Sequence, residues 1–327
     1  MKVTVFSSQA YDEKALRQHS PIDINWQFLP QKLDALTAIA AKGSDAVCVF
    51  VNDDLSEAVL TQLAGLGIFA VALRCAGFNN VDLQAAKKLG VRVMRVPAYS
   101  PQAVAEHTTG MMLCLSRKFH KAYNRTRDNN FDLNGLLGFN LYGKTVGLIG
   151  TGRIGVATAR ILHGFGCTLL CVDPVKNDEV SALGARYVSL AELYRQSDII
   201  SLHCPLTPQS HHMINDTALQ QMKDGVMLIN TSRGALIDTK AVIAALKTAK
   251  IGYLGLDVYE QEADLFFKDL SDKVIADEIF QRLLTFPNVL ITGHQAFFTE
   301  EALAQISRIT ADNLLAYTQN KKSGNEL

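Results

Sequence analysis

The chain of 327 residues lacks the features that would place it in a specialised class. Its 32 Lys and Arg residues balance 32 Asp and Glu residues, so no basic surplus points to nucleic acid. No apolar run reaches the ~18 residues that cross a membrane. The apolar run after Met1 stops at Ser7, which is too short for a secretion signal. With 8 Pro and 22 Gly, the chain is neither collagen-like nor proline-rich.

The cysteines and histidines also lack the spacings of known centres. The six cysteines form no C-x-x-C pair, and most lie inside apolar runs. We therefore favour buried free thiols over disulfides, which indicates a reducing, cytoplasmic compartment. The histidines show no H-x-x-x-H spacing, and no G-x-S-x-G motif occurs. We expect no metal site and no serine hydrolase.

Hydrophobic residues make up 48% of the chain, and they gather in strand-like runs that alternate with helical patterns. Continuous β-branched runs separated by helices are typical of parallel sheets covered on both faces. Five strands are expected within residues 1–98 and six between residues 145 and 292. At ~150 residues per domain, the sequence predicts an α/β protein with two doubly wound parallel-sheet domains.

Three further segments complete the expected secondary structure. Residues 100–127 are predicted to form one long helix, because Pro101 suits a first helical turn and no later proline interrupts the pattern. Its length suggests an element that leaves one domain and enters the other. A helical pattern also covers residues 33–41, and the polar run 321–327 is expected to fray.

A glycine-rich motif follows the first strand of the second series. Gly150, Gly152 and Gly155 fit G-x-G-x-x-G at a predicted strand-to-helix junction. These glycines permit a tight turn, the approach of a pyrophosphate, and close packing of helix on strand. Asp173 ends the next strand, where a carboxylate accepts hydrogen bonds from ribose hydroxyls. The pattern predicts a Rossmann domain, and NAD is favoured over NADP because Asp173 would repel a 2′-phosphate.

Polar residues follow three of the predicted strands. Arg233 follows one strand, the acids Asp257, Glu260 and Glu262 follow another, and His294 follows the last. Ligands of doubly wound sheets bind beyond the carboxyl ends of the strands, so these side chains should share one edge. Arginine can clamp a carboxylate, histidine can protonate a ketone oxygen, and a carboxylate can orient the imidazole. This set suits hydride transfer from a nicotinamide to a 2-oxo acid.

At these residues the sequence resembles the D-isomer-specific 2-hydroxyacid dehydrogenase family. The matching stretches are VNDD, LRCAGFNNVD, RVPAYSPQAVAEH, YGKTVGLIGTGRIG, SDIISLHCPLT, MLINTSRGALID, GLDVYE and GHQAFFTEEAL. They span nearly the whole chain. The run VYEQEADLFFKDLSDK has no proline, which resembles the lactate branch more than the glycerate and phosphoglycerate branches.

The resemblance implies a domain arrangement and a set of site residues. A flavodoxin-like substrate domain would comprise residues 1–99 and 299–327, with the Rossmann NAD-binding domain, residues 100–298, inserted into it. The implied catalytic residues are Arg233, Glu262 and His294. The implied cofactor-binding residues are Gly150, Gly152, Arg153, Ile154, Gly155, Asp173, Cys204, Pro205, Thr231 and Asp257. The implied substrate-binding residues are Ala76, Gly77, Tyr99, Arg233 and Phe297.

The activity that the resemblance implies is NAD-linked reduction of pyruvate to D-lactate by a homo-oligomer, either a dimer or a tetramer. Two alternatives remain open, namely a larger 2-oxo acid substrate and a non-catalytic NAD(H)-sensing interaction protein. Phe266 and Phe267 would either narrow the substrate pocket or belong to the core. Thr108 and Thr109 depart from the family pattern, in which small residues are common after the histidine at 107. His107 itself is a weaker catalytic candidate than His294.

Overall fold

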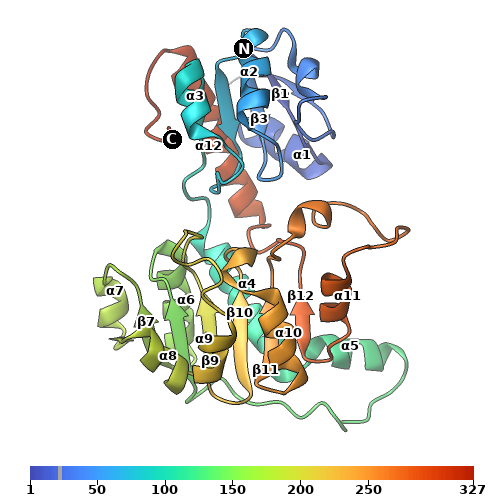
Figure 1. Cartoon of the computed structure of the whole chain (residues 1–327), viewed down its shortest axis with the longest axis vertical. Coiled ribbons are helices and arrows are strands. Elements are labelled where there is room, and N and C mark those ends of the chain that lie inside the picture. Colours follow the sequence, from blue (N-terminus) through green and yellow to red (C-terminus); the bar gives the residue numbers. More distant parts are fainter. Residues whose placement is uncertain (21–23) are drawn as a thin grey trace. The chain divides into compact units, whose positions relative to one another are not determined.

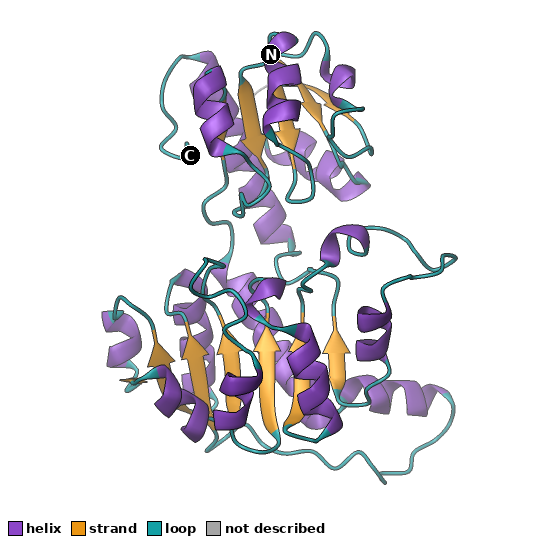
Figure 2. Cartoon of the chain, viewed as in Figure 1, coloured by secondary structure: helices purple, strands orange, loops and turns teal. Residues whose placement is uncertain are grey.

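The computed structural model describes residues 1–20 and 24–327, and the chain divides into two compact units. The first unit contains Met1–Ser100 and Phe298–Leu327, and the second contains Pro101–Phe297. The resemblance implies junctions at residues 99/100 and 298/299, and the two units divide at residues 100/101 and 297/298. Each unit has one parallel sheet with helices on its faces (Figures 1 and 2). The chain is therefore an α/β protein.

The first unit is built on five parallel strands in the order β2-β1-β3-β4-β5, which is the flavodoxin-like order. Its strands are β1 (Lys2–Val5), β2 (Asn25–Phe28), β3 (Ala46–Val49), β4 (Ala70–Leu73) and β5 (Arg92–Met94). Its helices are α1 (Ala10–His19), η1 (Ala38–Ala41), α2 (Glu57–Gly65), α3 (Leu83–Leu89) and α12 (Glu300–Thr318). Helix α1 packs beside α12, and α2 packs beside α3. All residues of β3 and β4 are buried, as expected of a sheet covered on both faces.

The second unit contains a seven-stranded parallel sheet in the order β12-β11-β10-β9-β6-β7-β8. Its strands are β6 (Thr145–Ile149), β7 (Thr168–Val172), β8 (Arg186–Tyr187), β9 (Ile199–Leu202), β10 (Val226–Asn230), β11 (Ile251–Leu256) and β12 (Val289–Ile291). The chain moves outward from β6 through β7 and β8, and then resumes on the other side of β6 with β9. This reversal is the topological switch point at which doubly wound sheets bind nucleotides. The sequence missed β8, which is too short to show a periodic pattern.

Helices cover both faces of the second sheet (Figure 2). They are α4 (Pro101–Arg117), α5 (Phe119–Arg127), α6 (Arg153–Gly164), α7 (Asp178–Ala182), α8 (Leu190–Gln196), α9 (Asp216–Gln221), η2 (Gly234–Leu236), α10 (Thr239–Lys247), η3 (Glu262–Asp264) and α11 (Glu278–Leu284). Successive strand residues enter different cores, since Ile199 and Ile229 belong to one cluster and Ile200 and Leu228 to the other. This alternation explains why the strands are apolar throughout.

The single long helix predicted for residues 100–127 is wrong, because the chain breaks into α4 and α5 at Lys118. Lys118 has the left-handed backbone angle φ of 55°. The carbonyl oxygen of Ser116 accepts the amide of Phe139 at 3.2 Å. Gly138 also lies so close that a Cβ there would meet that oxygen at 2.1 Å. No local signal marks the break, since it depends on contacts with a distant segment.

Two other segments differ from the sequence-based expectation. In residues 33–41 only η1 is helical, because the carboxylate of Asp34 accepts the amide of Thr37 at 2.9 Å and forms a turn before it. The run 321–327 does not fray. Glu326 forms an antiparallel bridge with Met94, and the amide of Leu327 donates to the carbonyl of Val93 at 3.0 Å.

Candidate active site

Polar side chains gather at the carboxyl ends of β10, β11 and β12, which are neighbours in the second sheet (Figure 1). Arg233 follows β10, Asp257 and Glu262 follow β11, and His294 follows β12. Because the three strands are parallel, their following segments lie at one edge of the sheet. This edge is where the sequence places the candidate catalytic groups.

His294 and Glu262 form a close pair. Nδ1 of His294 lies 2.8 Å from Oε1 of Glu262, and both side chains are largely buried. The second carboxylate oxygen of Glu262 accepts the amide of Tyr259 at 3.0 Å, which fixes the carboxylate at the start of η3. Among the described residues of this unit, Nε2 of His294 has no hydrogen-bonding partner. The imidazole is thus oriented through one nitrogen and keeps the other for a ligand.

Asp257 shapes the turn that carries His294. Its side chain is fully buried, and it accepts the hydroxyl of Thr292 at 2.5 Å and the amide of Ala296 at 2.9 Å. Burial acts to raise the pKa of Asp257, but hydrogen bonds from His107, Thr292 and Ala296 outweigh it and hold the pKa below its ordinary value. The backbone oxygen of Asp257 also accepts the amide of His294 at 2.7 Å. The resemblance implies that Asp257 lies near the cofactor, which stays a prediction, and in the structure this carboxylate organises residues 292–296.

Arg233 lies in a turn that is held mainly by its neighbours. The buried side chain of Asn230 accepts the amide of Ser232 at 3.0 Å and donates to the carbonyl of Arg233 at 2.8 Å. The hydroxyl of Ser232 donates to the carbonyl of Cys204 at 2.7 Å. The guanidinium donates to the carbonyl of Ser232, and no carboxylate among the described residues of this unit pairs with it. Its charge is therefore available to an anionic ligand.

Glu260, the other glutamate near this edge, belongs to a separate pair. Its Oε1 lies 2.6 Å from Nε2 of His212, and its Oε2 accepts the hydroxyl of Thr239 at 2.9 Å. The structure therefore brings Glu262, and not Glu260, to His294. The positions of the two acids after the strand did not separate them, and only the family resemblance pointed to Glu262.

The glycine motif forms an open turn at the switch point. Gly150 has φ of 101°, and a Cβ at Gly155 would meet the oxygen of Gly150 at 2.2 Å, so neither tolerates a side chain. Gly152 caps α6 without a side-chain hydrogen bond, and a Cβ there would meet nothing within 4 Å. The first-turn amides, at Arg153 and Ile154, therefore have no side-chain cap from the N-cap residue. Such amides bind anions well.

Asp173 lies beside this turn, after β7. Its Oδ2 accepts the amide of Thr151 at 2.7 Å, which ties the carboxylate to the glycine loop. Cys204 and Pro205 follow β9, the strand next to β6. A Cβ at Gly150 would come within 2.7 Å of the nitrogen of Cys204, so the two segments touch. The predicted cofactor-binding residues in these segments thus border one another.

The first unit carries three of the predicted substrate-binding residues. Ala76 and Gly77 follow β4. Their two amides have no acceptor among the described residues of this unit, while Nη1 of Arg95 donates to the carbonyl of Ala76 at 3.0 Å. Tyr99 follows β5 and is half-buried. The loop therefore presents two successive amide donors.

The sequence left open whether Phe266 and Phe267 narrow the substrate pocket or belong to the core, and the structure places the two rings differently. Phe266 is buried in the core, and its ring lies 6.0 Å from that of Phe280. The ring of Phe267 lies 5.6 Å from the ring of His294. Phe297, which is also buried, places its ring 6.5 Å from the same imidazole. Phe266 is thus a core residue, whereas Phe267 and Phe297 flank His294.

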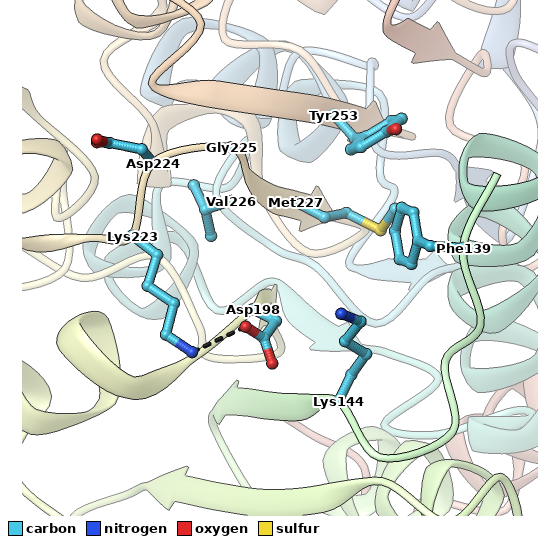
Figure 3. Close-up of a pocket in the computed structure, with 9 residues that line it drawn as sticks. All are labelled: Phe139, Lys144, Asp198, Lys223, Asp224, Gly225, Val226, Met227 and Tyr253. Carbon is cyan, nitrogen blue, oxygen red and sulfur yellow. Dashed lines mark hydrogen bonds and ion pairs between the residues drawn. The ribbon is translucent and has the colours of Figure 1, made fainter. Parts of the chain in front are cut away.

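A hollow of about 300 Å³ lies at the opposite, amino edge of the second sheet (Figure 3). Val226 begins β10, and Asp198 and Lys144 immediately precede β9 and β6. The figure shows Lys223 paired with Asp198, at 2.8 Å, and the ring of Phe139 on the other side of the hollow. None of the predicted site residues lines it. This hollow is separate from the edge that carries His294.

The described residues contain neither a membrane-spanning helix nor a cluster of side chains that could share a metal ion. No helix in residues 1–20 and 24–327 combines the length and apolar character needed to cross a bilayer. In the same residues, no group of three or more His, Cys, Asp or Glu side chains is placed to share a metal ion.

Comparison with known proteins assigns the chain to a class. The model of the family "D-isomer specific 2-hydroxyacid dehydrogenase, NAD binding domain" matches residues 109–296. The chain therefore belongs to the D-isomer-specific 2-hydroxyacid dehydrogenases, which the resemblance predicted. The matched residues fall inside the second unit, so this unit is the NAD-binding domain and NAD is its cofactor.

Individual relatives are similar over the full length. The chain is 56% identical to D-lactate dehydrogenase of Escherichia coli over 328 residues, covering 100% of both chains. It is 55% identical to a 2-hydroxyacid dehydrogenase homolog of Haemophilus influenzae over 322 residues, covering 98% of this chain and 97% of the relative. The solved apo structure of the Escherichia coli D-lactate dehydrogenase matches with a TM-score of 0.92 and 53% identity, covering 100% of each chain.

The structure adds residues to the site that the sequence did not assign. Asn230 and Ser232 fix the Arg233 turn, and Thr292 joins Asp257 beneath His294. The only signal in the sequence was their closeness to the predicted catalytic residues along the chain. Asn230 acts through local bonds to Ser232 and Arg233. Ser232 and Thr292 act through bonds to Cys204 and Asp257, which lie far away along the chain.

Proposed function

We propose that the chain reduces pyruvate to D-lactate, with NADH as the hydride donor and His294 as the general acid. The observation that carries this proposal is the His294–Glu262 pair, whose free Nε2 lies at the same sheet edge as the unpaired Arg233. The relatives support pyruvate as the substrate, because one that is 56% identical over the whole chain is named D-lactate dehydrogenase.

His294 moves the proton in the proposed reaction. NADH, when bound, supplies the hydride that the carbonyl carbon accepts. Nε2 of His294 gives its proton to the carbonyl oxygen, which becomes the hydroxyl of the product. Glu262 accepts the hydrogen bond of Nδ1, so its negative charge stabilises the imidazolium before transfer and orients the ring during it. In the reverse reaction, neutral His294 takes the proton back.

Arg233 is assigned to the substrate carboxylate. Its planar guanidinium offers a two-pronged contact and also polarises the neighbouring carbonyl. We assign the same carboxylate to the amides of Ala76 and Gly77 and to the hydroxyl of Tyr99, with Phe297 packing nearby. The support is that both amides lack an acceptor within their own unit. The segments 1–99 and 299–327 are accordingly proposed as the substrate domain.

The glycine turn fits NAD. A side chain at Gly152 would occupy the open space before α6, and the uncapped amides there suit a pyrophosphate. Asp173 is proposed to accept the ribose hydroxyls, and Arg153, Ile154, Cys204, Pro205 and Thr231 to line the cofactor. A 2′-phosphate beside Asp173 would be repelled, so NADH should exceed NADPH by at least ~100-fold in kcat/KM.

A kinetic assay tests the proposal. NADH oxidation is measured with pyruvate, 2-oxobutyrate, 2-oxoisocaproate and phenylpyruvate, NADPH replaces NADH in parallel, and the product is resolved on a chiral column. Phe267 and Phe297 narrow the space beside His294, so kcat/KM should fall as the substrate side chain grows. Phenylpyruvate equal to pyruvate would favour a broader 2-oxo acid reductase. No turnover with any of them would favour an NAD(H)-sensing protein.

The homo-oligomer is proposed from an exposed apolar surface. The arm, which we define as residues 119–142, has six large apolar side chains that are each more than half exposed, namely Phe119, Tyr123, Phe131, Leu133, Leu137 and Tyr142. A monomer rarely exposes so many apolar groups on one segment. We propose that a second copy of the chain covers the arm.

The proposed compartment is the reducing cytoplasm. Its support is that all six cysteines are free thiols and four of them are buried.

A further inference from the structure

Two neighbouring residues of α4 each contact one of the turns that carry the proposed catalytic groups. His107 contacts the turn before His294, and Thr108 contacts the turn before Arg233. Neither residue has a part in the proposed mechanism. All of these groups belong to the second unit, so the contacts concern a single compact body.

Thr108 fixes the turn that leads to Arg233. Its side chain is completely buried, and its hydroxyl donates to the carbonyl of Val104 at 2.7 Å. The same oxygen lies 2.8 Å from the hydroxyl of Thr231. Because a hydroxyl carries a single proton, Thr231 must be the donor in this second bond. Thr108 thus fixes the rotamer of Thr231, two residues before Arg233.

His107 reaches the other turn. Its Nε2 lies 3.1 Å from the hydroxyl of Thr292 and 3.4 Å from Oδ1 of Asp257. Thr292 in turn donates to Asp257 at 2.5 Å. The backbone oxygens of both Asp257 and Thr292 accept the amide of His294, at 2.7 and 3.1 Å. His107 therefore contacts both residues that hold His294 in its turn.

We propose that His107 and Thr108 are positioning residues. From one turn of α4 they hold His294, the proton donor, and Arg233, which binds the substrate carboxylate, at a fixed separation. A helix is stiff, so two adjacent side chains on it set the relative placement of the two turns that they contact. Catalysis depends strongly on such placement, since a misplacement of 1 Å can cost ~100-fold in rate. The inference rests on the proposed function only in naming His294 and Arg233 as the reacting groups.

Thr109 provides a matched control for Thr108. It is also a buried threonine on α4, and its hydroxyl donates to the carbonyl of Ala105 at 2.9 Å. In the described chain this is its only side-chain hydrogen bond. Thr108→Val and Thr109→Val therefore remove the same type of bond within the helix with little change of shape, but only Thr108→Val removes a bond to a catalytic turn.

The kinetic constants should separate the two positions. Thr108→Val should raise the KM for pyruvate by about fivefold, because the turn that carries Arg233 becomes less well fixed. The KM of Thr109→Val should stay within about twofold of the parent value. Thr108→Ser, which keeps the hydroxyl, should restore the parent value. His107→Phe should lower kcat at least tenfold, and His107→Gln, whose amide can occupy the place of Nε2, should retain most of it.

Hydrogen exchange tests the same proposal without any turnover. In the unliganded protein, Thr108→Val should speed exchange in peptides that cover residues 230–234, and His107→Phe should speed it in peptides that cover 292–296. Thr109→Val should change neither, although its melting temperature should also fall. Equal exchange and equal kinetics for Thr108→Val and Thr109→Val would overturn the proposal. An inactive parent protein that shows the expected exchange pattern would instead reject the proposed function alone.

Discussion

At the scale of single residues, His294 occupies a backbone conformation that few residues other than glycine adopt. Its φ is 53°, which costs about 1–3 kcal/mol. Such a conformation persists only where the surroundings impose it. Here the amide of His294 is held by the oxygens of Asp257 and Thr292, and the ring is held by Glu262. The surroundings thus place the imidazole with one nitrogen directed at a carboxylate and the other available.

The charge of Glu262 should contribute directly to turnover. Glu262→Gln keeps a hydrogen-bonding side chain beside Nδ1 of His294 but removes the negative charge, so kcat for pyruvate reduction should fall by about tenfold or more, with a smaller change in KM. Glu260→Gln is the matched control, because Glu260 pairs with His212. Equal steady-state constants for the two variants would exclude the assigned role of Glu262.

Arg233 should be irreplaceable by lysine. Arg233→Lys keeps the positive charge but loses the planar, two-pronged contact with a carboxylate. We expect KM for pyruvate to rise and kcat to fall, with a loss of about 2–4 kcal/mol in transition-state stabilisation. Arg186→Lys, at an exposed arginine on β8, should leave the steady-state constants unchanged. Activity of Arg233→Lys within threefold of the parent would remove Arg233 from the site.

His203 should make the fold sensitive to acid. Burial lowers the pKa of His203 from 6.5 to about 4. Between these two values the unfolded chain binds a proton that the folded chain does not, so stability should decline as pH falls from about 6.5 to 4. Urea titrations at several pH values should show a shallower decline for His203→Gln. His163→Gln, at an exposed histidine, is the control. If stability declines equally with falling pH in His203→Gln and His163→Gln, the assignment to His203 is contradicted.

At the scale of elements, the last residues of the chain lie next to a predicted substrate loop. The backbone of Arg95 donates to the carbonyl of Asn325 at 3.0 Å and accepts the side-chain amide of Asn313 at 2.9 Å. Asn325 also donates to Asn313 at 2.8 Å. The side chain of Arg95 donates to the carbonyl of Ala76. The run 321–327 therefore supports, through Arg95, the loop with the two free amides.

Removal of residues 323–327 should consequently weaken substrate binding. Without Asn325, the backbone of Arg95 loses an acceptor, and the loop at Ala76 loses part of its support. We expect the KM for pyruvate to rise about threefold to tenfold, with a smaller change in kcat. Asn325→Ala should show part of this effect. Lys322→Ala, at an exposed neighbour, should show none, and unchanged constants in the truncated protein would reject the link.

At the scale of the whole molecule, both units are wound as parallel sheets, and each places its predicted site residues after its strands. In the first sheet, Ala76 and Gly77 follow β4, and in the second, Arg233 and His294 follow β10 and β12. The hollow beside Lys223 lies at the amino edge of the second sheet, and none of the candidate groups lines it. In each unit these candidate groups therefore lie at the carboxyl ends of the parallel strands.

The exposed arm should decide the oligomeric state. Leu133→Asp replaces an exposed apolar side chain of the arm with a charged one, so it should shift the protein toward monomers. Light scattering coupled to size-exclusion chromatography measures the mass of each form. Leu36→Asp is the control, since Leu36 is at least as exposed as Leu133 but lies in the first unit. If Leu133→Asp and the parent protein have the same mass, the arm is not the contact between subunits.

Local patterns were enough to predict most of the fold. Apolar runs predicted all five strands of the first sheet and six of the second, and the glycine motif predicted the turn at the switch point. The residues that carry the family resemblance placed Arg233, Glu262 and His294 after the correct strands. The break at Lys118 was not predictable, because it depends on Phe139 and Gly138, which contact Ser116 from another part of the chain.

The sequence by itself determined the class of the protein, because strand periodicity, glycine spacing and the residues after each strand are local properties. Only the tertiary structure decided how the polar groups pair. In the structure Glu262 pairs with His294, and Glu260 pairs with His212. Asp257 is buried, and it accepts a hydrogen bond from Thr292 in the turn before His294. The physical reason is that a hydrogen bond of about 3 Å depends on the packing of several strands and helices at once, which no spacing along a single segment records.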